Sequence, residues 1–157
     1  MELPAETVEA LLEGWPVARL ASVRASGAPH LVPVVFAQAA GRLWIPLDGK
    51  PKGEGELLRV RNLRREPRAA LLLDHWDADW RRLWWLRVDA RAAVCEAGAG
   101  AAPAFEEAEQ ALRAKYPQYR ETPLFRDLPR MIALDPSGRR SWAASEAARA
   151  AAASASG

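Results

Sequence analysis

The segment from Leu83 to Cys95 constrains the fold more than any other part of the chain. Apolar residues occur there at alternate positions, with Arg87, Asp89 and Arg91 between them. Successive side chains of a strand point to opposite faces of a sheet, so this pattern predicts one long strand with a buried face. The inward residues are Trp84, Leu86, Val88, Ala90 and Ala92.

Five shorter segments also have the composition of strands. Turn-forming residues at 24–27 separate the first two, and Gly41 precedes the third, which predicts an antiparallel meander of three consecutive strands. Pro136, Ser137 and Gly138 predict a turn after the last one. The expected ranges are 17–23, 30–37, 43–47, 68–74 and 131–134.

The helices expected from periodicity are short and few. They cover 5–13, 56–65 and a segment after the small-residue linker 97–103 that ends at Pro117. About six strands with such helices predict a mainly β (α+β) fold, a small β-barrel with peripheral helices. We expect one domain over residues 1–145, followed by an alanine- and serine-rich tail, 146–157, that could be frayed or disordered.

Composition narrows the classes of function. The chain has 157 residues, half of them hydrophobic, and 22 basic residues nearly balance 20 acidic ones, which argues against a nucleic-acid partner. We find no apolar run long enough for a membrane span and no secretory signal at the acidic N-terminus. Cys95 is the single cysteine, so neither an internal disulfide nor a cysteine-based zinc cluster can form within one chain. A cytoplasmic location is therefore expected.

The stretch from Pro29 to Asn62 contains a candidate anion site. Lys50 and Lys52 follow the predicted strand 43–47 directly, and a helix starting near Gly55 would point its free backbone amides at the same place. Lysine and arginine together can neutralise and orient a phosphate. The alternative is that both lysines are solvated loop charges.

Both histidines have two interpretations. His30 could donate a hydrogen bond to a cofactor carbonyl, or it could be a satisfied polar residue at a strand start. His75 lies among Asp74, Asp77 and Asp79, which suits a metal site, but their spacing differs from that of a calcium-binding loop. A loop packed by Trp76 and Trp80 is the preferred interpretation. No arrangement of side chains suggests nucleophilic or acid–base catalysis.

Several segments, taken in order, resemble a known family. They are HLVPVVF, LWIPLDGKPK, RVRNL with Pro67 after it, ALLLDHWDADWRRLWWLRVDARA, LRAKYPQYRE and MIALDPSGRRSW. Together they resemble the pyridoxamine 5'-phosphate oxidase-like split β-barrel flavoproteins. More narrowly, the chain looks like the branch of probable deazaflavin (coenzyme F-420)-dependent enzymes. The resemblance covers nearly all of residues 10–145.

The resemblance implies a homodimer of split barrels with two cofactors, FMN or coenzyme F-420, in clefts between the subunits. The cofactor ring would lie along His30, Leu31, Val32, Pro33 and Val34 and along Ile45, Pro46 and Leu47. The phosphate would be held by Lys50, Lys52, Arg61 and Asn62. Trp142 would approach the ring from the partner subunit, or serve as a core residue. No histidine follows His75, so the substrate signature of true pyridoxamine phosphate oxidases has no counterpart.

The leading hypothesis is an oxidoreductase that transfers a hydride between the bound cofactor and a small unsaturated substrate. The alternatives are a flavin or deazaflavin carrier or sensor without catalysis, and a barrel that binds single-stranded nucleic acid. FMN and the deazaflavin share a tricyclic ring, a ribityl chain and a phosphate, so the same basic residues suit both. The longer acidic tail of the deazaflavin could use Arg64, Arg65 and Arg68, which could also be ordinary surface charges.

Overall fold

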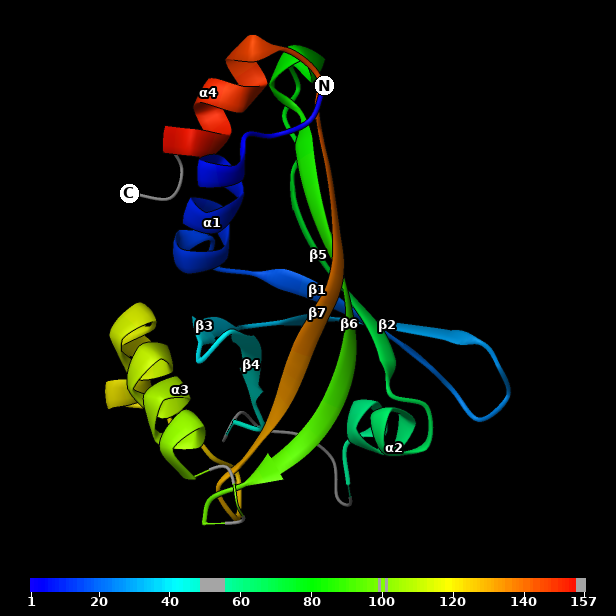
Figure 1. Ribbon diagram of the computed structural model, residues 1–157, viewed down its shortest axis with the longest axis vertical. Helices are drawn as coiled ribbons and strands as arrows, with labels where there is room; N and C mark the ends of the chain where they lie inside the picture. Colours follow the sequence, from blue (N-terminus) through cyan, green and yellow to red (C-terminus); the bar gives the residue numbers. More distant parts are fainter. Residues whose placement is uncertain (49–55, 99, 101, 155–157) are drawn as a thin grey trace.

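The computed structural model describes residues 1–48, 56–98, 100 and 102–154 (Figure 1). These residues form seven strands, four α-helices and two short 3-10 turns. The helices are α1 (Ala5–Gly14), α2 (Leu58–Arg65), α3 (Ala102–Lys115) and α4 (Glu146–Ser154), and the 3-10 turns are η1 (Trp80–Arg82) and η2 (Pro117–Arg120). The strands are β1 (Ala18–Val23), β2 (Pro29–Val34), β3 (Ala37–Ala39), β4 (Arg42–Pro46), β5 (Arg68–His75), β6 (Trp84–Glu96) and β7 (Arg130–Ala143).

All seven strands belong to one antiparallel sheet, in the order β2-β1-β5-β6-β7-β4-β3. Its two edge strands, β2 and β3, are consecutive in the chain, and only Val35 and Phe36 separate them. Two residues cannot span a flat sheet, so the sheet must curl until its edges meet. This confirms the predicted mainly β fold with peripheral helices, and the barrel is a split one.

The barrel interior is filled mainly by the alternating residues of the long central strands. Trp84, Leu86 and Val88 of β6 are all buried, as predicted, in one cluster with Leu71 of β5 and Leu20 of β1. A second apolar cluster lies under α3, where Trp44 meets Phe105 edge-on. Among the described residues, no helix combines the length and the apolar character that a membrane crossing needs.

The predicted strand 30–37 is two strands, and the predicted three-strand meander is wrong. β2 pairs with β1, whereas β3 pairs with β4, and β4 continues the sheet through β7. The strand is interrupted at Phe36, where a distant side chain binds the backbone. The Tyr116 hydroxyl accepts a hydrogen bond from the Phe36 N–H at 3.2 Å and lies 3.0 Å from the Phe36 carbonyl, so it replaces a strand partner there.

The turn predicted at Pro136, Ser137 and Gly138 is a bulge inside β7. Pro136 faces Ala90 and Gly138 faces Asp89, which leaves Ser137 without an opposite residue in β6. The Ser137 hydroxyl instead donates to the Asp89 carbonyl at 3.1 Å. Proline lacks the N–H that a regular ladder needs, so a bulge accommodates it without ending the strand.

The sequence predicts a tail after residue 145 that could be disordered, but the structure folds Glu146–Ser154 into α4. Alanine is the best helix former, and the Ser145 hydroxyl accepts a hydrogen bond from the Ala148 N–H. Ala148 and Ala152 are fully buried in the main apolar cluster, and α4 packs beside α1 (Figure 1). The small alanine side chains therefore let α4 pack closely against the main apolar cluster. Residues 155–157 lie outside the described part of the chain.

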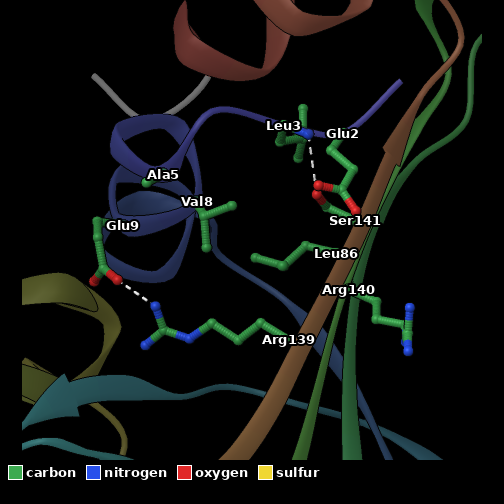
Figure 2. Close-up of a pocket in the computed structure, with 9 residues that line it drawn as sticks. All are labelled: Glu2, Leu3, Ala5, Val8, Glu9, Leu86, Arg139, Arg140 and Ser141. Carbon is green, nitrogen blue, oxygen red and sulfur yellow. Dashed lines mark hydrogen bonds and ion pairs between the residues drawn. The ribbon is translucent and has the colours of Figure 1, made fainter.

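Helix α1 contacts the part of β7 that is not paired with β4. Strand β4 pairs with β7 only from Met131 to Leu134. Among the described residues, the part of β7 after Leu134 is not paired with β4. Glu9 of α1 accepts hydrogen bonds from Gln38 of β3, at 3.1 Å, and from Arg139 of β7 (Figure 2). One carboxylate thus connects α1 to both strands.

We predict that Glu9→Ala lowers the free energy of unfolding by about 1 kcal/mol, because exposed ion pairs contribute little individually. The hydrogen bond from Gln38, and then that from Arg139, lower the pKa of Glu9 below its ordinary value of 4.5. The stabilisation is therefore present above that value and is lost as the pH falls through the lowered pKa. Denaturant unfolding at pH 7 and at acidic pH measures both effects.

A double-mutant cycle with Arg139→Ala should show coupling between the two residues. Arg140→Ala is the control, because the Arg140 side chain lies on the other side of β7 (Figure 2). Equal effects of Glu9→Ala in the Arg139→Ala and wild-type backgrounds would contradict the prediction.

Candidate functional site

Two of the predicted site residues meet at Ser22 of β1. Ser22 is opposite His30 in the register of β1 and β2, and its hydroxyl lies 3.5 Å from His30 Nδ1. The same hydroxyl accepts a hydrogen bond from Asn62 Nδ2 of α2 at 3.1 Å. Ser22 and Asn62 are both buried. The structure therefore joins His30 and Asn62 through a residue that the sequence did not indicate.

The inward-facing arginine of α2 is Arg59, not Arg61. Arg59 is only 9% exposed, on the same side of the helix as Asn62, whereas Arg61 is exposed and roughly 200° away around the axis. Among the described residues, the buried Arg59 Nε has no hydrogen-bond partner. Burial lowers the pKa of Arg59, and the nearby Asp48 carboxylate opposes that effect. The spacing from Arg59 to Asn62 could have revealed this residue, because positions three apart share a helix face.

Asp48 is a buried carboxylate at the exit of β4. The Tyr119 hydroxyl of η2 donates to its Oδ2 at 3.1 Å, and both side chains are less than 8% exposed. Burial, and then the negative charge of Asp48, raise the pKa of Tyr119 above its ordinary value. Tyr119 therefore stays protonated and keeps donating this hydrogen bond.

The predicted phosphate residues Lys50 and Lys52 lie outside the described residues. In the sequence they lie between Asp48, just after β4, and Glu56, just before α2. Two further basic residues, Arg126 and Arg130, line a hollow with Leu47, Glu56 and Val60. Arg130 also pairs with Glu56 at 3.8 Å. Neither arginine was predicted from the sequence to belong to the site.

The predicted ring surface divides into an exposed part and a buried part. On β2, Leu31 and Pro33 are exposed, whereas Val32 and Val34 point toward the apolar core. On β4 and at its exit, the side chains of Ile45, Pro46 and Leu47 are buried, so a bound ring would meet the backbone there.

Trp142 lies far from Asn62 and its neighbours Ser22 and His30 within one chain. It faces Trp85 across β6 and β7 and is 40% exposed. The next residue, Ala143, exchanges backbone hydrogen bonds with Met1, which places this end of β7 beside the N-terminus, and Figure 1 shows α2 at the other end of the molecule. A single protomer therefore does not bring Trp142 to Asn62.

The environment of His75 differs from the preferred prediction. Its ring stacks on Trp84 and meets Trp15 edge-on, while Trp76 and Trp80 are each 72% exposed and do not bury the loop. His75 Nε2 lies 3.6 Å from Asp77 Oδ2. Within the described ranges, no three histidine, cysteine or acidic side chains are grouped so that they could hold a metal ion.

Comparison with known proteins agrees with this fold. The family model described as pyridoxamine 5'-phosphate oxidase matches residues 4–142. No curated protein is significantly similar to the chain.

Solved structures with a similar fold include an FAD-binding protein from Mesorhizobium loti, with 18% identity, a TM-score of 0.63 and coverage of 90% of this chain and 93% of that one. An F420 reductase has 22% identity, a TM-score of 0.59 and coverage of 83% and 94%, respectively. The heme storage protein HutZ from Vibrio cholerae has 18% identity, a TM-score of 0.60 and coverage of 91% and 95%. Identities this low show a shared fold, and the family match covers most of the chain. The chain therefore belongs to the pyridoxamine 5'-phosphate oxidase family of split β-barrels.

Proposed function

We propose that this protein binds a phosphate-bearing flavin or deazaflavin, FMN or coenzyme F-420, and transfers a hydride between it and a small unsaturated substrate. The observation that carries the proposal is the buried Arg59 guanidinium, whose Nε has no hydrogen-bond partner among the described residues, on the same face of α2 as buried Asn62. Burying a cation without enough partners is costly, and a phosphate would offset that cost with charge-assisted hydrogen bonds.

The proposal gives each of these site residues a role. Arg59 and Asn62 hold the inner side of the phosphate, Lys50 and Lys52 contribute positive charge, and Arg61 contributes from the solvent side. The ring rests on Leu31 and Pro33 and on the backbone of Ile45, Pro46 and Leu47, with His30 at its edge. The bound cofactor supplies the redox chemistry, while the protein provides binding, orientation and electrostatics.

The similar structures support the cofactor class without choosing a member of it. One is an FAD-binding protein and another an F420 reductase, whereas a third stores heme, so this fold serves more than one planar ligand. The anion site at α2 is what favours a flavin-type phosphate here. Turnover of a substrate is a further step, and binding without turnover would reduce the proposal to a cofactor-binding protein.

A second copy of the chain would complete the site. Two large apolar side chains, Leu31 on β2 and Trp142 on β7, are exposed, and burying them against a second copy would be favourable. Because Trp142 and Asn62 lie at different ends of one protomer, the partner's Trp142 is the one proposed to approach the ring. We therefore propose a homodimer with the cofactor between the subunits.

We predict that Arg59→Met weakens the binding of FMN or coenzyme F-420 by about tenfold to a hundredfold, because a hydrogen bond to a charged group contributes about 1.5–3 kcal/mol. Methionine keeps part of the buried apolar stem. Titration followed by ring absorbance and fluorescence measures the Kd, and Arg61→Met, the exposed arginine of the same helix, should have a smaller effect. A wild-type protein that binds neither cofactor, or that binds heme instead, would overturn the proposed function.

The pKa of His30 should respond to the phosphate. In the free protein, burial and then the positive charges of Arg24 and Arg59 lower this pKa below its ordinary value of 6.5. A bound phosphate opposes those positive charges, so the pKa should rise on cofactor binding. NMR titration of the two imidazoles, with His75 as the internal reference, checks this. Equal shifts at both histidines, or a lower His30 pKa with cofactor, would contradict it.

Leu31→Asp should prevent dimer formation, because it places a charge on an apolar face that the proposed partner covers. Light scattering after size-exclusion chromatography measures the mass, and cofactor affinity should fall in parallel. Ala147→Asp adds the same charge at an exposed position of α4 and should leave the dimer intact. A wild-type monomer with full cofactor affinity would be inconsistent with the proposed dimer.

A further inference from the structure

A hollow lies where the chain crosses from β2 to β3. It has a volume of about 260 Å³, and Val35, one of the two residues between those strands, forms part of its wall. Its described lining residues are Pro16, Val35, Tyr116, Gln118, Tyr119 and Thr122. Ser22, Arg59 and Asn62 are not among them, so the hollow does not share its described walls with the proposed phosphate site.

Two buried tyrosines form the aromatic part of the wall. The exposed fractions of Tyr116 and Tyr119 are 6% and 7%, and their rings meet edge-on with centroids 6.1 Å apart. The Tyr116 hydroxyl donates to the Pro16 carbonyl at 2.9 Å, and the Tyr119 hydroxyl donates to Asp48 at 3.1 Å. Because both hydroxyls already use their protons in these bonds, the rings offer a ligand mainly apolar carbon. Aromatic walls of this kind favour a flat, ring-shaped ligand.

Gln118 and Thr122 are the two polar side chains of the wall. Gln118 is exposed and Thr122 is half-buried. The Thr122 N–H donates to the Gln118 carbonyl at 3.0 Å, so one backbone turn holds both residues together. Within the described part of the chain, neither side chain has a hydrogen-bond partner. An amide and a hydroxyl can each donate and accept, so a polar group on a ligand could bond to either one.

Size and charge limit what the hollow can hold. An engineered apolar cavity of about 150 Å³ holds benzene, so about 260 Å³ gives room for one or two fused rings. None of the described lining residues carries a charge. The Lys115 ammonium lies 5.6 Å from the centre of the Tyr116 ring, but it donates to the Leu12 carbonyl and is not one of the lining residues. An ionised ligand would therefore lose hydration without gaining a charged partner in the described walls.

We infer that this hollow is a binding site for a small, uncharged molecule that has one or two aromatic rings and a polar substituent. The rings pack against Tyr116 and Tyr119, and the substituent bonds to Gln118 or Thr122. This site goes beyond the proposed function, and it does not depend on it, because the lining residues have no role in holding the cofactor phosphate.

The first experiment is an NMR titration of the full-length protein, without added cofactor, with 2-naphthol. This probe has two fused rings, one hydroxyl and no charge at pH 7. We expect saturable shifts of the backbone amides of Val35, Gln118 and Thr122, with a Kd of about 0.1–1 mM for so small a ligand. Naphthalene-2-sulfonate has the same rings with a fixed negative charge, and it should bind at least about tenfold more weakly.

The second experiment changes the wall. Thr122→Phe fills the hollow and should raise the Kd of 2-naphthol by about tenfold or more. Gln118→Ala changes an exposed side chain, so the fold is kept, and should raise the Kd by about twofold to tenfold, the scale of one neutral hydrogen bond. Glu121→Phe is the control, because Glu121 is exposed beside Thr122 and does not line the hollow. Its Kd should equal that of the wild type, and thermal unfolding checks that every variant is folded.

Four results would overturn the inference. They are a wild type that shows no saturable binding of 2-naphthol, amide shifts that lie away from the lining residues, a Kd left unchanged by both Thr122→Phe and Gln118→Ala, and equal binding of naphthalene-2-sulfonate. None of these results bears on the proposed function, which is tested by cofactor titration. A protein that binds neither flavin nor deazaflavin would, in turn, leave this site standing.

Discussion

The contact on which the barrel depends most is the one between the Tyr116 hydroxyl and the backbone of Phe36. A single buried oxygen accepts the Phe36 N–H and lies within hydrogen-bonding distance of the carbonyls of Phe36 and Pro16. Burial raises the pKa of Tyr116 to about 12, so the hydroxyl keeps its proton. The strand can therefore stop at Val34 and restart at Ala37 without leaving the backbone groups of Phe36 unpaired. That interruption sends β2 and β3 to opposite edges of the sheet and closes the barrel.

The proposed site follows from that closure. β4 ends at Pro46, two residues before Asp48, and α2 places Asn62 against Ser22 of β1, with Arg59 on the same face of the helix. Most charged pairs of this protein are partly exposed, as Arg19 with Asp74 and Arg113 with Glu109 illustrate. The buried charges at Arg59 and Asp48 are different, because burial makes their interactions stronger and unpaired groups costlier. Proteins with a similar fold include an FAD-binding protein, an F420 reductase and a heme storage protein, so the fold alone does not decide the ligand.

Prediction from sequence succeeded where a pattern is local and long. The alternation in β6, the amphipathic α1 and the helix ending before Pro67 each depend on neighbouring residues alone. It was wrong at 30–37, because the side chain that interrupts the strand lies 80 residues later. Pro136 to Gly138 reads as a turn locally, but the thirteen paired residues of β6 keep that segment in one strand. At the site, His30 and Asn62 were named from sequence, while Ser22, Arg59 and Tyr119 were not, since their significance lies in contacts across the fold.

The amino-acid sequence by itself determined the mainly β class, the family resemblance and the position of two lysines between a strand and a helix. These depend on periodicity, turn chemistry and the order of short segments, which are properties of residues close together in the sequence. Only the tertiary structure decided which strands pair, which arginine of α2 faces inward and that Trp142 lies away from Asn62 in one protomer. The physical reason is that burial and hydrogen bonding are properties of groups distant in sequence, and folding alone brings them together.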